Sequence, residues 1–175
     1  PLHDLDLSQV ESSVRGKLLS QVDLVLQGLP HLRVPGSVTL VSGIMSRIPW
    51  AGGVTAAIAN GGIDAFVRAV AAELGDGRRI NAVSPSIVQE SIDALGGDNP
   101  LPGHEPVTAA RVALAFVRSV EGIESGTTFR VGHRAPPPSP PGVRPCPCAP
   151  SRSGVRSRSS PSPPPPRCCP QLRRA

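Results

Sequence analysis

The sequence contains no tyrosine, and its aromatic residues are limited to one tryptophan and three phenylalanines. It has no run of about eighteen consecutive apolar residues, which excludes an obvious membrane-spanning helix. Residues 1–6 also lack the basic segment followed by an apolar segment that marks a secretory signal peptide. These absences favour a soluble protein of the cytoplasm that does not bind a membrane.

Acidic residues are missing from the C-terminal part of the chain. No Asp or Glu follows Gly132, whereas fourteen of the 22 prolines, all four cysteines and eight of the eighteen Lys and Arg residues do. Residues 1–132 therefore carry ten basic and thirteen acidic residues, a net charge of −3. We predict a folded body over residues 1–132 and a tail over residues 133–175. The tail is expected to be disordered because proline fixes its own φ and gives no N–H to a helix or sheet.

The tail offers only weak signals of function. Its four cysteines lack the C-x2-C spacing of a zinc site and the four histidines of the chain are scattered, so we expect no bound metal. Residues 152–158 resemble an arginine-serine tract that binds RNA electrostatically. No aromatic residue stands among them for base stacking, so nucleic-acid binding is the weaker alternative. A shifted reading frame or an intron in GC-rich DNA would also produce this composition.

Three segments of the body have the apolar periodicity of amphipathic helices, namely residues 9–28, 54–74 and 107–121. Ser8 and Glu11 have the form of a capping box at the start of the first segment. The second segment carries Asn60 and two glycines near its start, where better helix formers would be less costly. The predicted buried stripes are Val10, Val14, Leu18, Val22 and Val25 in the first helix, Ile63, Phe66, Val67, Val70 and Leu74 in the second, and Val112, Phe116, Val117 and Val120 in the third.

Three short β-branched segments alternate with these helices and predict strands over residues 37–43, 79–85 and 126–131. The first is expected to be buried on both faces, and residues 92–106 are expected to form a loop. Alternating helices and strands imply parallel strands joined by right-handed crossovers, and hence an α/β fold. Three strands are few for a sheet that must be covered on both sides, so the body is expected to be part of a larger domain.

Four segments of the body resemble the second half of a short-chain dehydrogenase/reductase, a family of Rossmann-fold oxidoreductases that use NAD or NADP. The segments are GSVTLVSG (36–43), the helix TAAIANGGIDAFVRAVAAEL (55–74), RRINAVSPSIVQES (78–91) and GTTFRVG (126–132). Their order and spacing match over most of residues 1–132. The resemblance implies the C-terminal part of a Rossmann-like, doubly wound parallel sheet with three strands and three helices, and a dinucleotide cofactor.

The catalytic positions of the family are altered in this sequence. In the family a tyrosine phenol, with an ordinary pKa of about 10, exchanges a proton with the substrate oxygen, and a nearby lysine stabilises the phenolate. Residue-by-residue matching places the family's serine at Gly43, its tyrosine at Ala56 and its lysine at Asn60. The asparagine that holds a relay water falls on Lys17. The resemblance therefore implies an oxidoreductase by descent that is catalytically inactive.

Several residues near these positions remain candidates for the site. Ser42, at the end of its strand, is a candidate catalytic hydroxyl, or else a serine that bonds backbone; Lys17 is a candidate substitute cation, or else a solvated lysine. Asn60 is a candidate partner of a ribose hydroxyl, or else an ordinary polar residue of the helix. The residues that match the nicotinamide end of the family's site are Pro85, Ile87, Val88 and Ser91.

The phosphate end of a cofactor site has no counterpart in the sequence, because no G-x-G-x-x-G or G-x-x-x-G-x-G pattern follows a predicted strand. This absence predicts a truncated family member. The family pairs its subunits through the helices that match residues 9–28 and 54–74, so the resemblance also implies a homo-oligomer through these two helices. A non-catalytic interaction module is therefore the main alternative to an oxidoreductase.

Overall fold

A computed structural model describes residues 2–101 and 103–133 of the chain. Its sheet contains strands β1 (Ser37–Val41), β2 (Arg79–Pro85) and β3 (Thr128–Val131) in that order, and both pairs are parallel. The three predicted strands and their parallel arrangement are confirmed. The predicted disorder of the tail, its cysteines and the arginine-serine tract lie outside the described residues.

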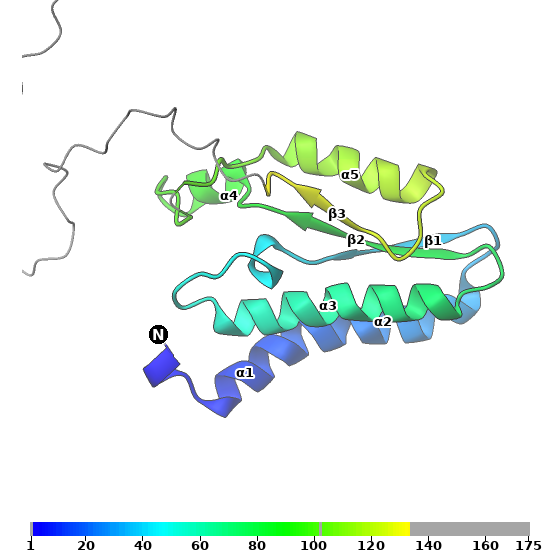
Figure 1. The fold of residues 1–175 in the computed structure, drawn as a ribbon, viewed down its shortest axis with the longest axis horizontal. Coiled ribbons are helices and arrows are strands. Elements are labelled where there is room, and N and C mark those ends of the chain that lie inside the picture. Colours follow the sequence, from blue (N-terminus) through cyan, green and yellow to red (C-terminus); the bar gives the residue numbers. More distant parts are fainter. Residues whose placement is uncertain (1, 102, 134–175) are drawn as a thin grey trace, which may run out of the picture. The chain divides into compact units, whose positions relative to one another are not determined.

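Helices cover both faces of this small sheet. The first helix, made of α1 (Leu7–Ser13), the π-helical segment η2 (Val14–Leu19) and α2 (Ser20–Gly28), lies with α3 (Val54–Glu73) on one face (Figure 1). Helix α5 (Ala109–Glu121) lies on the opposite face and packs against all three strands. This is the α/β arrangement expected for the C-terminal part of a Rossmann-like domain.

The first helix begins earlier than the sequence suggests. Asp6, rather than Ser8, caps it: the Asp6 carboxylate accepts a hydrogen bond from the Gln9 N–H at 2.9 Å, and the Asp6 N–H donates to the Gln9 side chain at 3.1 Å. The capping box predicted from Ser8 and Glu11 is therefore wrong by two residues, because Asp6 and Gln9 offer the same reciprocal pattern.

The hydrophobic core forms two clusters, one on each face of the sheet. The larger one joins β1 and β2 to the first helix and α3, and contains the predicted stripe of α3; its fully buried members are Val25, Leu40, Ile63, Val67, Ile80 and Ala82. The smaller one lies under α5 and contains Val83, Val107, Phe129 and Val131. Val112 and Phe116 of the predicted α5 stripe pack against this cluster. Val117 and Val120 do not, and their side chains are 56% and 47% exposed.

Strand β1 lies at an edge of the sheet, and the prediction that it is buried on both faces is wrong for Val41, which is 40% exposed. A side chain of the first helix completes part of this edge. The Val41 N–H donates to the Gln21 side-chain oxygen at 2.7 Å, and the Gln21 amide nitrogen donates to the Val41 carbonyl at 3.1 Å. Gln21 thus satisfies the two Val41 backbone groups that face away from β2.

A short helix, α4 (Gln89–Ala94), begins in the segment after β2 and occupies the start of the predicted loop. Its six residues carry little periodicity, which explains why the sequence did not reveal it.

Helix α3 is long and apolar enough to cross a membrane by length and composition, although the sequence has no run of about eighteen consecutive apolar residues. Core helices of soluble proteins pass the same test, and the apolar face of α3 packs against β1, β2 and the first helix. The cytoplasmic location remains a prediction.

Candidate functional site

The candidate site lies at the carboxyl ends of β1 and β2, which are on the same side of the sheet. In open parallel sheets the ligand crevice lies beyond the carboxyl ends of the strands. Here the end of β1 brings Ser42 and Gly43 close to α3 and to the first helix, and the end of β2 carries the segment 85–91. Lys17, Ser42 and Asn60, which are far apart in the sequence, meet at the end of β1.

The Ser42 hydroxyl is committed to the protein backbone. Ser42 is 2% exposed, its N–H donates to the Val83 carbonyl at 2.9 Å, and its Oγ donates to the Asn60 carbonyl at 3.2 Å. The hydroxyl therefore ties the end of β1 to the first turns of α3. In this arrangement the Ser42 hydroxyl does not face solvent.

Asn60 and Gly43 form a tightly packed pair. Asn60 is 1% exposed, and its side-chain oxygen is buried without a hydrogen-bond partner among residues 2–101 and 103–133. A Cβ atom on Gly43 would lie 2.9 Å from Asn60 Nδ2, which is closer than such atoms approach. The two residues that replace the family's serine and lysine therefore fit one another sterically.

Two glycines follow Asn60, and only one of them is required by packing. A Cβ on Gly62 would lie 2.5 Å from the Leu18 side chain of η2, whereas a Cβ on Gly61 would meet no atom within 4 Å. Gly62 therefore allows α3 to approach the first helix closely. Gly61 has no such role in this structure.

Lys17 reaches the site from the π-helical segment of the first helix. Its Nζ donates to the Ser42 carbonyl at 3.3 Å, and burial lowers the pKa of this half-buried amine from its ordinary value. Within residues 2–101 and 103–133, no carboxylate forms an ion pair with it. Short π-helical turns often mark functional sites, and this one places an amine beside the end of β1.

The segment after β2 is held by its own backbone and by Glu90. The Val107 N–H donates to the Ile87 carbonyl and the Gln89 N–H donates to the Val107 carbonyl, each at 2.9 Å. Both carboxylate oxygens of Glu90, which stands where the family has threonine, accept from the Ala109 N–H at 3.0 Å. A carboxylate at this place stabilises the N-terminus of α5.

A second polar cluster lies between α3 and the C-terminal half of the sheet. The Thr128 hydroxyl donates to Asp64 at 3.2 Å, and the Ser84 Oγ lies 3.3 Å from His133 Nε2. Burial and the positive charge of Arg130 lower the pKa of His133, whereas Asp64 opposes that shift. Ser84 is fully buried, so its hydroxyl is a structural partner of the imidazole.

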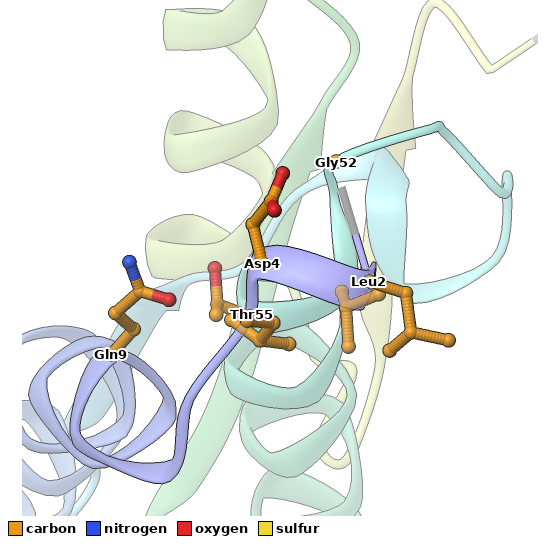
Figure 2. Close-up of a pocket in the computed structure, with 7 residues that line it drawn as sticks. Leu2, Asp4, Gln9, Gly52 and Thr55 are labelled. Carbon is orange, nitrogen blue, oxygen red and sulfur yellow. The ribbon is translucent and has the colours of Figure 1, made fainter.

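The described residues also form a cavity of about 310 Å³ away from these positions. It lies between the N-terminal segment and the start of α3, and Asp4, Gln9 and Thr55 bring polar side chains to it (Figure 2). Thr55 precedes Ala56, the position of the family's tyrosine. None of the predicted site residues lines this cavity.

Comparison with known proteins identifies the family. A family model described as Enoyl-(Acyl carrier protein) reductase matches residues 1–114, which is more than half of the chain. The chain belongs to the short-chain dehydrogenase/reductase family.

Solved structures of family members share the fold described above. A protein from Listeria innocua is 41% identical with a TM-score of 0.70, over 75% of this chain and 64% of that protein. A small-chain dehydrogenase solved with NADPH is 26% identical with a TM-score of 0.65, over 74% and 64% of the two chains. The chain thus spans less than two thirds of these relatives. A search of curated proteins found no significant match.

The described residues match only one end of the family's cofactor site. The segment 85–88 lies at the strand ends where the nicotinamide end would bind, and Ser91 is exposed on α4. None of the described strands is followed by a G-x-G-x-x-G or G-x-x-x-G-x-G turn that would hold the diphosphate on a helix N-terminus. No reaction step through a dinucleotide follows from this arrangement.

Lys17, Ser42 and Asn60 could be located from the sequence, but three roles of polar side chains could not. Gln21 on the β1 edge, Glu90 at the N-terminus of α5 and His133 beside Ser84 were not foreseen. The sequence could have indicated the Glu90 contact, because a carboxylate near the N-terminus of a helix stabilises that helix. The other two depend on contacts between distant segments, which no local pattern reveals.

Proposed function

We propose that this chain is a short-chain dehydrogenase/reductase module that does not catalyse proton-coupled hydride transfer. The observation that carries the proposal is the state of the three catalytic positions. Gly43 and Asn60 pack against each other in a closed contact, and Ala56 has no titratable group. A carbinol oxygen at the end of β1 would therefore find no phenol to exchange its proton.

The family relation supports residual recognition of NAD or NADP through Pro85, Ile87, Val88 and Ser91. One relative was solved with NADPH, and a more distant fold neighbour, carveol dehydrogenase from Mycobacterium avium, was solved with NAD. Contacts at the nicotinamide end alone predict weak binding, because the diphosphate usually supplies much of the affinity through a helix N-terminus.

Two measurements on the full chain test this function. Half-buried Trp50 reports binding when NADH or NADPH is titrated, and absorbance at the NAD(P)H band reports turnover with a panel of aldehydes and ketones. We expect weak binding without turnover. Turnover that requires the folded chain would overturn the proposal of inactivity, and the absence of binding at millimolar cofactor would overturn residual recognition.

A second candidate function is self-association through residues 9–28 and 54–74. Four large apolar side chains on these helices are exposed: Leu19 (47%), Leu24 (66%), Leu26 (63%) and Ile58 (44%). Static light scattering over a range of protein concentrations should show a dimer that Leu24→Gln weakens. Leu95→Gln is the matched control, because Leu95 is 88% exposed outside these helices. A monomer at all concentrations, or equal weakening by both variants, would exclude this interface.

A further inference from the structure

The cavity of about 310 Å³ between the N-terminal segment and the start of α3 is separate from the altered catalytic positions, none of which lines it. Its volume is at the lower end of the range for small-molecule sites, about 300–1,000 Å³. One wall is formed by the 3₁₀ turn η1 (Leu2–Asp4) and the start of the first helix, and the other by the loop before α3 and the first residues of that helix. The cavity therefore has the size and the opposing walls of a site for a small ligand.

The polar groups of this cavity give it a negative charge. Asp4, Gln9 and Thr55 bring a carboxylate, an amide and a hydroxyl to it, and Figure 2 shows the Thr55 side chain between the other two. Among the described residues, no basic side chain lines the cavity. Asp4 lies 3.2 Å from His3, but both side chains are largely exposed, and exposed ion pairs contribute little. The Asp4 carboxylate therefore favours a cationic ligand group over a phosphate or a carboxylate.

Hydrogen-bond donors and apolar surface lie beside this carboxylate. Helix α3 begins at the cavity wall, and its N-cap residue, Gly53, provides no side-chain acceptor for the first N–H groups of the helix. The Gln9 amide oxygen accepts from the Asp6 N–H at 3.1 Å, so the amide nitrogen remains as the donor of that side chain. Leu2 and Val54 belong to the apolar part of the wall, and Leu2 is 73% exposed. A ligand that covered Leu2 would remove apolar surface from water.

We propose that this cavity binds a small amino alcohol that carries an apolar group. The ammonium group pairs with Asp4, the hydroxyl bonds to Thr55 and to the donors beside it, and the apolar group packs on Leu2 and Val54. An amine without a hydroxyl leaves the donors without an acceptor, and an alcohol without an amine leaves the carboxylate without a counter-ion. This binding goes beyond the proposed function, because it needs neither a dinucleotide nor any of the altered catalytic positions.

Calorimetric titration of the full chain tests the proposal with three related probes. Phenylethanolamine carries both polar groups, whereas phenethylamine lacks the hydroxyl and the corresponding phenylethanol lacks the amine. We expect phenylethanolamine to bind with millimolar affinity, as is usual for a ligand of this size. Phenethylamine should bind about fivefold more weakly, which is the loss of one hydrogen bond, and phenylethanol about two- to fivefold more weakly, which is the loss of an exposed ion pair. Equal affinity for the three probes would overturn the proposal.

Two variants locate the binding site. Asp4→Asn should weaken phenylethanolamine binding about two- to fivefold and leave phenylethanol binding unchanged, and Thr55→Val should weaken phenylethanolamine binding about fivefold and leave phenethylamine binding unchanged. Asp98→Asn is the matched control, because Asp98 is an exposed acidic residue outside the cavity. No saturable binding at millimolar concentrations, or equal weakening by Asp4→Asn and Asp98→Asn, would refute the amino-alcohol site. The assay contains no dinucleotide, so its failure leaves the proposed function standing.

Discussion

Because Gly43 and Asn60 are in contact, we predict that the effect of substituting one of them on stability depends on the identity of the other. The perturbation is Gly43→Ala, which adds a Cβ atom 2.9 Å from Asn60 Nδ2. The Gly43 backbone is extended, with φ of 176°, so alanine meets no backbone strain there. The cost of the substitution should therefore come from the steric contact alone.

The magnitude follows from two opposing effects. Inserting a methyl group into a packed site costs about 1–3 kcal/mol. Alanine also reduces the conformational freedom of the unfolded chain, which stabilises the folded state by about 0.4–1 kcal/mol. In a chain that carries Asn60→Ala the first effect vanishes, and Gly43→Ala should then be neutral or stabilising. The coupling energy between the two substitutions should be about 1–3 kcal/mol.

Urea denaturation of the four proteins of this double-mutant cycle measures the coupling, with circular dichroism and Trp50 fluorescence as probes. Gly28→Ala is the matched control, because Gly28 is helical and a Cβ there meets nothing within 4 Å. Its effect should be the same with and without Asn60→Ala. If Gly43→Ala lowers the free energy of unfolding equally in both backgrounds, the steric account of this pair is refuted.

Three further predictions concern the stability of the body. Gly61→Ala should raise the free energy of unfolding by about 0.5–1 kcal/mol through helix propensity. Gly62→Ala should not give this gain, because its Cβ would clash with the Leu18 side chain. Thermal unfolding of both variants compares them directly. Glu90→Gln should lower stability by about 0.3–1 kcal/mol, an effect that salt reduces, and urea titrations at two ionic strengths measure it. The pKa of His133 is lower in the folded state than in the unfolded chain. The unfolded chain therefore binds more protons below about pH 6.5, and the free energy of unfolding should fall as the pH drops through that range. His133→Asn should reduce this dependence on pH, and an unchanged dependence would contradict its assignment to His133.

The fold could be predicted from the sequence because its signals are local. The apolar stripe of α3 has a clear helical period, and β2 is a β-branched run closed by Pro85, so both elements were placed nearly to the residue. Errors arose where two local patterns competed, as at Asp6 and Ser8, or where a segment was short, as in α4. The exposed side of α5 was misjudged because Val117 is apolar although it faces away from the strands.

The candidate site could be located from the sequence, but its internal contacts could not. Matching to the family placed Lys17, Ser42 and Asn60 at one site, and the structure brings them together. The orientation of each side chain depends on packing between α3, the first helix and β1. No spacing rule shows that the Ser42 hydroxyl bonds to a helix carbonyl or that Asn60 fills the space beside Gly43.

The pairing of Gln21 with Val41 sets a condition on any growth of the sheet. A side-chain amide has the same donor and acceptor as a peptide group, so Gln21 imitates one residue of a neighbouring strand. An incoming strand, whether from a longer form of this chain or from another molecule, must first displace that amide and gains no hydrogen bond at Val41 by doing so. Its net gain has to come from positions nearer the start of β1, such as Thr39, which faces the same side. Gln21 therefore opposes the addition of a further strand at the Val41 end of β1, and with it edge-to-edge association.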